Sequence, residues 1–510
     1  MYGRGLKMKK TLITLILFCI LIISAVPAYA ETKRETRKWQ DETIYSLMVD
    51  RFFNADTKND LDVNTLDPLA YNGGDFQGVM DKLDYLKDMG FTVVRLTSIF
   101  DNTSFGYHGY WVNDFYKIEE HFGSLKLFKK LVQEAHKRDM KVIIDFTANS
   151  VSPENPWVKD ETKQDWFNEK REIDNGADQD QVLNGWVNGL PDLNQDNPEV
   201  KKYLLDAAKW WINETDIDGY SLPEVNHVPI SFWSDFSKEV KSEKENFFLL
   251  GITTSNSEVD FEGYTGAGID SLTNYQHSES LRRVFAATNQ SFDELKDNDL
   301  QKSELQPQFF DNELTTRFTS DIVKNKHFPG ARWRTALTYI YSIPGIPVVF
   351  YGSEIALNGG EIPDNRQPMN FRTEKELIDY ITKLGELRNQ LPSLTRGSME
   401  MLYEKDGMAI YKRVYQDETA IIAINNTSES QHITLRNEQV EGGKELRGML
   451  NGDLVRSTDD NQYDLIIDRD EAEIYVLAKK SGINLPLIGS LVVVYILFTL
   501  FIIKVKKRKN

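Results

Sequence analysis

The sequence predicts an α/β protein built on a (β/α)8 (TIM) barrel, with an inserted domain after the third strand, a C-terminal β-sandwich and a C-terminal transmembrane helix. Three observations support this prediction. Short β-branched runs alternate with helical patterns from Lys38 to about residue 395, alternating strand patterns follow them, and residues 485–503 are almost wholly apolar. With 510 residues, 40% of them hydrophobic, the chain is long enough to bury a large core.

The first 30 residues have the pattern of a secretory signal peptide. Basic residues precede an apolar run from Leu12 to Ile23, and Ala28-Tyr29-Ala30 forms a small-x-small cleavage site. The mature chain would start near Glu31. Either Met1 or Met8 can serve as the start, because Met8 opens a complete signal by itself.

The opposite end has the pattern of a membrane anchor. About twenty apolar residues span the hydrocarbon core of a bilayer as a helix, and a basic flank marks the cytoplasmic side. Residues 485–503 meet the first condition and the basic tail 504–510 meets the second. We expect an exported, single-pass protein with its bulk outside the cell, of the kind found on a Gram-positive bacterial surface.

Charge and cysteine usage exclude several classes of function. The net charge is -18, and the signal and tail segments contain only basic charges, so the exported part is more negative still. Such a surface repels phosphate backbones, which argues against nucleic-acid binding. The only cysteine, Cys19, lies in the signal segment. The mature chain therefore has no disulfide, no thiol nucleophile and no cysteine-ligated zinc.

Eight short apolar runs are the candidate barrel strands in the barrel segments 31–150 and 196–394. They are Ile44–Val49, Val93–Thr97, Val142–Asp145, Gly219–Leu222, Phe247–Gly251, Gly268–Leu272, Gln308–Phe310 and Ile346–Tyr351. Helical patterns separate them, at Phe76–Met89, Ser124–Arg138, Pro198–Glu214 and Thr373–Asn389.

Two segments depart from this rhythm. The connection after the third strand is too long and too polar for an ordinary loop, and its tryptophans Trp157, Trp166 and Trp186 predict an inserted domain over residues 151–195. From residue 395 to 480, strand patterns such as Met408–Val414 and Thr419–Asn425 predict a β-sandwich.

Several segments together resemble the α-amylase family, glycoside hydrolase family 13. They include Asp50-Arg51-Phe52-Phe53-Asn54 after the first strand, Gly73-Gly74-Asp75 before the first helix, Leu190-Pro191-Asp192-Leu193-Asn194, and Gly345 to Gly352. The resemblance covers nearly all of residues 40–478. It implies the same barrel, inserted domain and sandwich, and a role in carbohydrate metabolism.

The resemblance fails at the residues that carry the chemistry. Pro223 stands where the family has its nucleophilic aspartate, Ile252 where it has the general-acid glutamate, and Leu314 where it has the second aspartate. Ser221 also replaces an arginine, which without its carboxylate partner would be a buried unpaired charge costing roughly 3–5 kcal/mol. Glycoside hydrolysis ordinarily needs two flanking carboxyl groups. The sequence therefore predicts an inactive member of the family, a pseudoenzyme, with no catalytic residues.

Displaced carboxylates are the alternative to inactivity. Glu224 lies one residue past the nucleophile's position, where a strand turns side chains to the opposite face. Glu313, Asp145 and Asp311 remain near the expected barrel mouth. A pair of these at a suitable separation would support hydrolysis of α-glucans, as in an α-amylase or cyclomaltodextrinase.

Other family positions are kept. The resemblance implies sugar contacts by an aromatic group at the barrel mouth and a charged pair near it, since aromatic faces cover sugar C–H patches and charged groups bind hydroxyls. The predicted sugar-binding residues are His108, Tyr110, Trp111, His227, Asp364 and Arg366. Packing at the barrel rim is the alternative role for these side chains.

Hard oxygen ligands occur in two groups, which indicates calcium in a structural role. The first group is a loop resembling a calcium loop of some family members, with Asn54, Asp56, Asn59, Asp60, Gly73 and Asp75. The second resembles the family's site between barrel and inserted domain, formed by Asn149, Asp192 and the carbonyl of His227. Ordinary turn chemistry is the alternative for such Asx-rich segments.

The leading hypothesis is a membrane-anchored, extracellular protein that binds α-glucan or maltodextrin, or a partner protein, without cleaving it. The first rival is an active α-glucan hydrolase with displaced carboxylates. The second is a scaffold subunit of a membrane complex.

Overall fold

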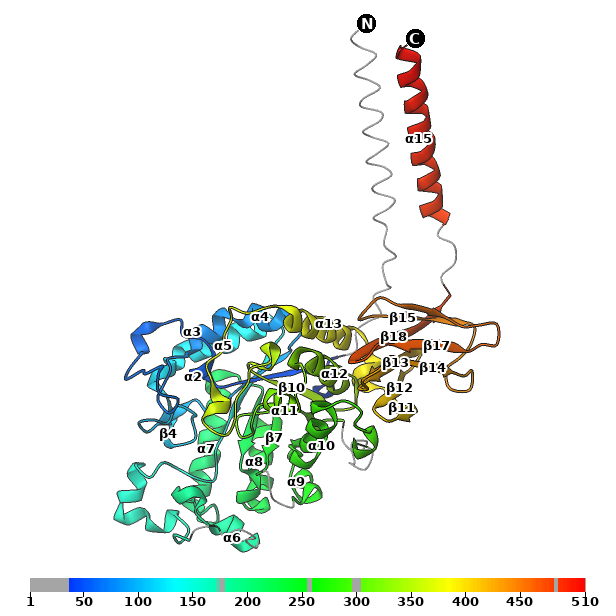
Figure 1. Cartoon of the computed structure of the whole chain (residues 1–510). Coiled ribbons are helices and arrows are strands. Elements are labelled where there is room, and N and C mark those ends of the chain that lie inside the picture. The colour runs from blue at the N-terminus through cyan, green and yellow to red at the C-terminus, as the bar shows by residue number, and fades with distance from the viewer. Residues whose placement is uncertain are drawn as a thin grey trace. The chain divides into compact units, whose positions relative to one another are not determined.

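The computed structural model describes residues 36–171, 173, 179–254, 259–295, 304–480 and 485–509. The predicted signal peptide, 1–30, lies outside these residues. Two compact units are present, and the larger one, Lys38–Gly442 with Leu446–Leu477, contains the barrel and most of the C-terminal strands (Figure 1).

Eight parallel strands form the barrel, in the order β8-β7-β6-β5-β2-β1-β10-β9. All eight overlap the predicted runs. They are β1 (Ile44–Leu47), β2 (Val93–Leu96), β5 (Lys141–Asp145), β6 (Gly219–Pro223), β7 (Phe248–Ile252), β8 (Ser271–Leu272), β9 (Pro307–Gln308) and β10 (Ile346–Phe350). The first and last members of this order are joined by side chains, since Gln306 Nε2 donates to the carbonyl of Leu272 at 3.0 Å.

Several barrel helices begin at residues whose side chains accept hydrogen bonds from free N–H groups of the first turn. Ser124 accepts from Leu127 N at the start of α5 (Leu125–Lys137), and Asn197 accepts from Glu199 N before Pro198 opens α7 (Pro198–Thr215). The helix predicted over Phe76–Met89 consists of two short helices, α3 (Phe76–Asp81) and α4 (Leu83–Asp88). The remaining helices of the barrel are α2 (Val49–Phe52), α8 (Ile230–Glu243), α9 (Phe261–Gly266), α10 (Tyr275–Ala286), α11 (Phe318–Lys324), α12 (Pro329–Ser342), α13 (Glu376–Gln390) and α14 (Pro392–Arg396).

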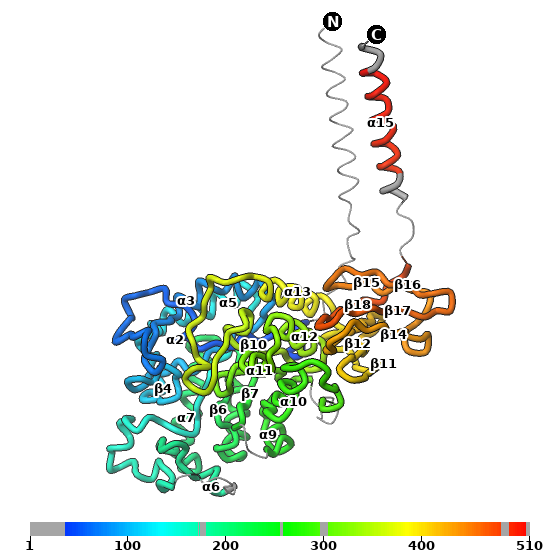
Figure 2. The backbone as a smooth tube through the Cα atoms, in the orientation of Figure 1, coloured from blue at the N-terminus to red at the C-terminus, as the bar shows by residue number. Residues whose placement is uncertain are grey.

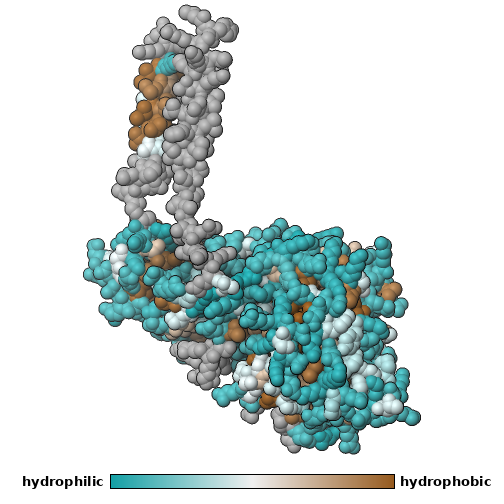
Figure 3. Space-filling view, turned by 180° about the vertical axis from the view of Figure 1, so that it is seen from behind, coloured by the Kyte–Doolittle hydropathy of each residue, from teal (hydrophilic) through white to brown (hydrophobic). Residues whose placement is uncertain are grey.

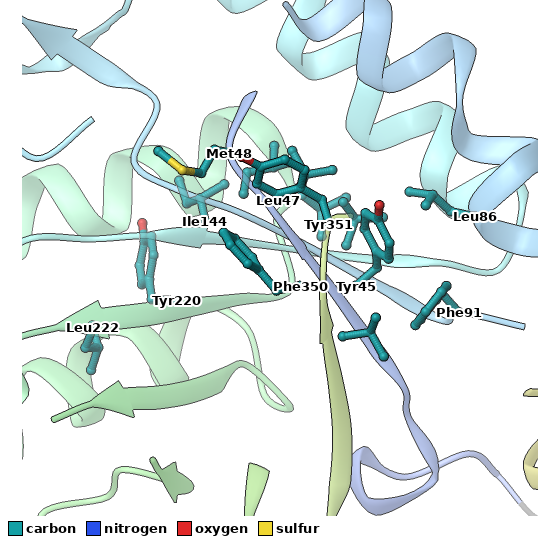
Figure 4. Close-up of a cluster of buried hydrophobic side chains, with 14 of the residues drawn as sticks. Tyr45, Leu47, Met48, Leu86, Phe91, Ile144, Tyr220, Leu222, Phe350 and Tyr351 are labelled. Atoms are coloured by element: carbon teal, nitrogen blue, oxygen red, sulfur yellow. The ribbon is translucent and has the colours of Figure 1, made fainter. Parts of the chain in front are cut away.

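Apolar residues fill the space between strands and helices, as burial on both faces of a parallel sheet requires. Figure 4 shows part of this cluster, with Tyr45, Ile144, Tyr220 and Phe350 contributed by four different strands. All four are fully or almost fully buried. The barrel interior is thus a packed core, and a site can form only where the strands end.

The segment between β5 and β6 contains the short helices η4 (Pro156–Lys159), η5 (Glu161–Trp166), α6 (Gln179–Asn184) and η6 (Val187–Gly189). Trp157 packs edge-on against Trp166 and Tyr203, with ring centroids 4.9 and 4.8 Å apart. Two of the three tryptophans that marked this segment in the sequence therefore hold it against α7. In Figure 2 the segment is the cyan to green part of the tube that includes the label α6.

The C-terminal strands form two sheets that share an apolar core. A six-stranded sheet has the order β11-β12-β13-β18-β15-β16, and β14 pairs with β17. Ile410 and Ile421 from the large sheet lie in one buried cluster with Leu435 and Leu465 from the small one. The strands are β11 (Ser398–Lys405), β12 (Met408–Tyr415), β13 (Glu418–Asn425), β14 (Gln431–Leu435), β15 (Lys444–Gly448), β16 (Leu454–Arg456), β17 (Tyr463–Ile467) and β18 (Glu471–Lys479).

Helix α15 (Leu485–Lys509) belongs to the smaller unit. Figure 3 shows hydrophobic side chains along it, whereas the visible face of the larger unit is mainly hydrophilic. Within the described residues, none of the helices has the combined length and apolar character needed to cross a membrane. The predicted transmembrane helix over 485–503 thus gains no support here, and it stays a prediction from the sequence, as do export and the cytoplasmic tail.

Candidate functional site

The positions of the predicted missing nucleophile and general acid lie side by side at the ends of two neighbouring strands. Pro223 ends β6, Ile252 ends β7, and the two are direct register partners in the parallel pair. Both are buried, with Ile252 only 4% exposed. Leu314, beyond β9, is 41% exposed. Three side chains that cannot exchange a proton or attack carbon therefore occupy these positions.

An arginine from another strand binds the carboxylates that remain. Arg95 of β2 donates from Nη2 to Asp145 Oδ2 at 2.8 Å and to Glu313 Oε1 at 2.7 Å. Its Nε donates to Asp145 Oδ1 at 2.9 Å and its Nη1 to Glu313 Oε2 at 3.1 Å, so both pairs are bidentate. All three side chains are at least 97% buried. The guanidinium lies between the carboxylates and neutralises one of their two charges.

Hydroxyl groups complete this network. Arg95 Nε also reaches Ser221 Oγ at 3.0 Å, and Arg95 Nη1 donates to Ser46 Oγ at 2.9 Å. The Tyr110 hydroxyl donates to Asp145 Oδ2 at 2.9 Å. Ser221 of β6, where the family resemblance implies an arginine, thus contacts an arginine of β2.

Burial and Arg95 act in opposite directions on the two carboxyl groups. Burial raises the pKa of Asp145 to about 6, although the charge of Arg95 opposes this shift. Burial also disfavours ionisation of Glu313, but the charge and hydrogen bonds of Arg95 outweigh it and lower the pKa of Glu313. Asp145 is therefore the member of the pair that takes up a proton as the pH falls.

Asp311 and Glu224, the other two carboxylates considered as displaced catalytic groups, also make structural contacts. Asp311 accepts from Phe318 N and from Ser353 Oγ, each at 2.9 Å, which ties it to the start of α11. Glu224 has a left-handed backbone, with φ 53°, and its Oε2 accepts from Asn149 Nδ2 at 3.3 Å. Its carboxylate therefore contacts the segment after β5.

The predicted aromatic contacts form one group beside the Arg95 network. The rings of His108 and Tyr110 are stacked, with centroids 5.6 Å apart, and Trp111 meets His108 edge-on at 4.8 Å. Tyr110 and Trp111 are partly exposed, whereas His108 is buried. Burial lowers the pKa of His108 to about 3, so this ring is neutral.

Asp364 and Arg366, the predicted charged pair, differ in exposure: one lies on the surface and the other in the interior. Asp364 is exposed and accepts from Gly360 N within its own loop. Arg366 is 6% exposed, and its Nε donates to the carbonyl of Glu313 at 3.0 Å. His227 is also buried, and it is remote in sequence from the aromatic group. Arg366 therefore supports the backbone that carries Glu313.

The first predicted calcium group is brought together by the fold. Asn54 Nδ2 donates to Asp60 Oδ1 at 2.9 Å, beside Gly73, where an added Cβ would lie 2.8 Å from the same oxygen. Asp75 instead caps α3 through Gly78 N, and its other oxygen accepts from the N–H groups of Ala55 and Asp56. Asn59 Oδ1 is buried without a hydrogen-bond partner among the described residues.

The second group offers the clearer fit to a cation. Asn149 and Asp192 are 0% and 1% exposed, and a β-bridge between Ser150 and Asp192 holds their segments together. One oxygen of each, Asn149 Oδ1 and Asp192 Oδ1, has no hydrogen-bond partner in the described part of the chain. Burial raises the pKa of Asp192 to about 8, although a hydrogen bond from Asn168 opposes this shift.

No three His, Cys, Asp or Glu side chains of the described residues are grouped closely enough to hold a metal ion among themselves. A cation at either group would therefore need amide and carbonyl oxygens in addition to carboxylates. Calcium accepts such mixed oxygen ligands.

Comparison with protein families agrees with this architecture. Residues 46–391 match the model described as "Alpha amylase, catalytic domain", and residues 397–475 match "Alpha-amylase C-terminal domain". The chain belongs to the alpha-amylase family. The predicted family is thus confirmed, together with the barrel and the C-terminal β-sheet domain.

Several relatives of this family member are named as enzymes. An Anoxybacillus alpha-amylase is 56% identical, with a TM-score of 0.85 over 88% of this chain and 100% of its own. The Geobacillus thermoleovorans alpha-amylase, solved with acarbose, is 53% identical, with a TM-score of 0.84 over 87% of this chain and 100% of its own. A Paenibacillus polymyxa beta/alpha-amylase is 33% identical over 82% of this chain, which spans only 36% of that protein's length.

Arg95 is the member of this site that sequence reasoning missed. A signal was present, because an arginine inside the apolar run Val93–Thr97 would be buried and would need a charged partner. Its two partners lie 50 and 218 residues away in sequence. Nothing in the sequence alone says that both converge on it.

Proposed function

We propose that this alpha-amylase family member binds α-glucan at the barrel mouth without hydrolysing it. The observation that carries the proposal is the pair Pro223 and Ile252, two buried apolar side chains in register where the family has its nucleophile and general acid. Arg95 supports it further, because it holds the remaining carboxylates as ion pairs. A carboxylate bound at both oxygens by a guanidinium is a poor nucleophile and a poor proton donor.

Binding is proposed on the partly exposed rings of Tyr110 and Trp111, with the exposed carboxylate of Asp364 as a further candidate contact. Stacked aromatic faces cover sugar C–H groups, and such a surface needs no catalytic group. The Geobacillus thermoleovorans relative was solved with acarbose, a compound we therefore choose as a probe.

Hydrolysis by displaced carboxylates is the second candidate function. The relatives are named as amylases, and these names favour hydrolysis over inactivity. It would require Glu313 and Asp145, which share Arg95, to act as the pair. Loss of turnover in a Glu313→Gln variant would identify it.

Titration of the purified chain with acarbose and maltodextrin tests the binding proposal. Calorimetry should record binding, and Tyr110→Ala should weaken it about tenfold, equivalent to roughly 1.4 kcal/mol. Tyr403→Ala, a partly buried tyrosine of β11, is the matched control and should leave the affinity unchanged. Absence of binding heat would instead favour the scaffold alternative.

We also propose a structural calcium ion at Asn149, Asp192 and the carbonyl of His227, and a second at the loop of Asn54 and Asp60. Because calcium would bind only the folded chain, it should stabilise the protein by about 2.7 kcal/mol at a concentration of 100 times Kd. Differential scanning calorimetry with calcium and with a chelator measures this shift. Identical melting temperatures in the two buffers would contradict the calcium proposal.

A further inference from the structure

Glu224 is the one acidic side chain that follows directly on the position of the lost nucleophile. Pro223 ends β6, and Glu224 then adopts the left-handed conformation with φ 53° and ψ 39° before the turn Val225–His227. For a residue with a Cβ this conformation is unfavourable by roughly 1–3 kcal/mol. The chain therefore directs this side chain at an energetic cost, and its contacts show where it points.

Those contacts lie at the second candidate calcium group. Glu224 Oε2 accepts from Asn149 Nδ2 at 3.3 Å. Its backbone carbonyl accepts from His227 N at 2.8 Å, which closes the turn that carries His227. The segment of Asp192 lies beside Asn149 as well, since Leu193 N donates to the carbonyl of Asn149 at 2.7 Å, and the negative charge of Glu224 raises the pKa of Asp192.

The same place contains two buried oxygens that lack partners among the described residues. Asn149 Oδ1 and Asp192 Oδ1 belong to side chains that are 0% and 1% exposed. Asp192 Oδ2 already accepts from Asn168 Nδ2 at 2.6 Å, so only its other oxygen is available. Leaving a buried polar atom unsatisfied costs about 1–3 kcal/mol, and two carboxylates facing one another add repulsion.

We propose that Glu224 is an additional carboxylate ligand of the divalent cation held by Asn149 and Asp192. This inference rests on the calcium ion proposed above and adds a ligand that the resemblance does not supply. A cation between Glu224, Asn149 Oδ1 and Asp192 Oδ1 satisfies the unpaired oxygens and removes the repulsion at once. With two carboxylates, the site balances both charges of calcium, and a higher ligand charge gives tighter binding.

This assignment also bears on the displaced-carboxylate alternative. With its left-handed backbone, Glu224 directs its carboxylate toward Asn149 in the segment after β5. As a ligand of the cation, it would fasten that segment to the turn after β6. A carboxylate bound to the cation would not be free to attack a sugar as a displaced nucleophile.

Calcium titration of Glu224→Gln tests the inference. The background is Asp60→Asn, which removes a carboxylate from the other calcium group and isolates this site. We expect the Kd for calcium to rise at least about tenfold in Glu224→Gln. In the presence of a chelator, this variant should melt at the same temperature as its parent or higher, because the repulsion between Glu224 and Asp192 is removed. Glu245→Gln, an exposed residue far along the chain, removes the same charge and should leave the Kd unchanged.

Glu224→Asp, with a carboxylate on a shorter stem, should give an intermediate Kd and guards against misfolding of the glutamine variant. Equal calcium affinities of Glu224→Gln and its parent would overturn the ligand assignment while leaving the calcium ion itself in place. A parent that binds no calcium by calorimetry would overturn the calcium proposal and this inference with it.

Discussion

Replacing Arg95 with methionine should lower the free energy of unfolding by about 3–5 kcal/mol, the cost of leaving a buried ion pair without one partner. Asp145 and Glu313 would face each other with no cation between them, and both are at least 99% buried. Denaturant unfolding followed by circular dichroism measures the loss. A surface control, Arg334→Met, removes an exposed pair with Glu376 and should cost less than about 1 kcal/mol.

The triple variant Arg95→Met, Asp145→Asn, Glu313→Gln separates charge from packing. It removes all three charges and should recover most of the lost stability, since a neutral cluster needs no compensation. If the triple variant is as unstable as Arg95→Met, packing rather than ion pairing explains the effect.

The loss caused by Arg95→Met should also depend on pH. In the folded protein the pKa of Asp145 is about 6, above its ordinary value of 3.8. Ionising Asp145 therefore costs folding free energy. This cost is complete above about pH 6 and disappears as the pH falls toward about 4. Removing Arg95 disfavours ionised Asp145 and Glu313 still more. The destabilisation should therefore be largest at neutral pH and shrink on acidification, and a loss independent of pH would contradict this account.

Purified protein should hydrolyse maltodextrin at least about a millionfold more slowly than the Geobacillus thermoleovorans alpha-amylase, a deficit of roughly 8 kcal/mol in transition-state stabilisation. In the proposed function, Pro223 and Ile252 stand in place of the attacking group and the proton donor, and loss of one such group alone has an effect of this order in serine proteases. The measurement is release of reducing ends, with both proteins assayed in calcium buffer.

Two control variants decide the origin of any residual turnover. Turnover that persists in both Glu313→Gln and Asp145→Asn does not depend on the two carboxylates bound to Arg95. Turnover near that of the relative, abolished by Glu313→Gln, would replace binding with hydrolysis as the function.

The local sequence was sufficient to predict the barrel. Each barrel strand is a short buried run whose apolar character does not depend on its partners, and all eight predicted runs contain the observed strands or overlap them. The strand ends were less accurate, as for the seventh run, Gln308–Phe310, where the residues that pair with β10 are Pro307 and Gln308. Hydrogen bonding to a neighbour decides where a strand ends, and that neighbour is remote in sequence.

By itself, the sequence determined which side chains exist at the site: proline, isoleucine and leucine where the resemblance implies carboxylates. Only the tertiary structure decided what the neighbouring acids do. Arg95 reaches Asp145 and Glu313 because β2, β5 and the turn after β9 meet there, and Glu224 turns toward Asn149 because its backbone is left-handed. Both outcomes depend on side-chain directions and long-range packing, which the order of residues along one strand does not specify.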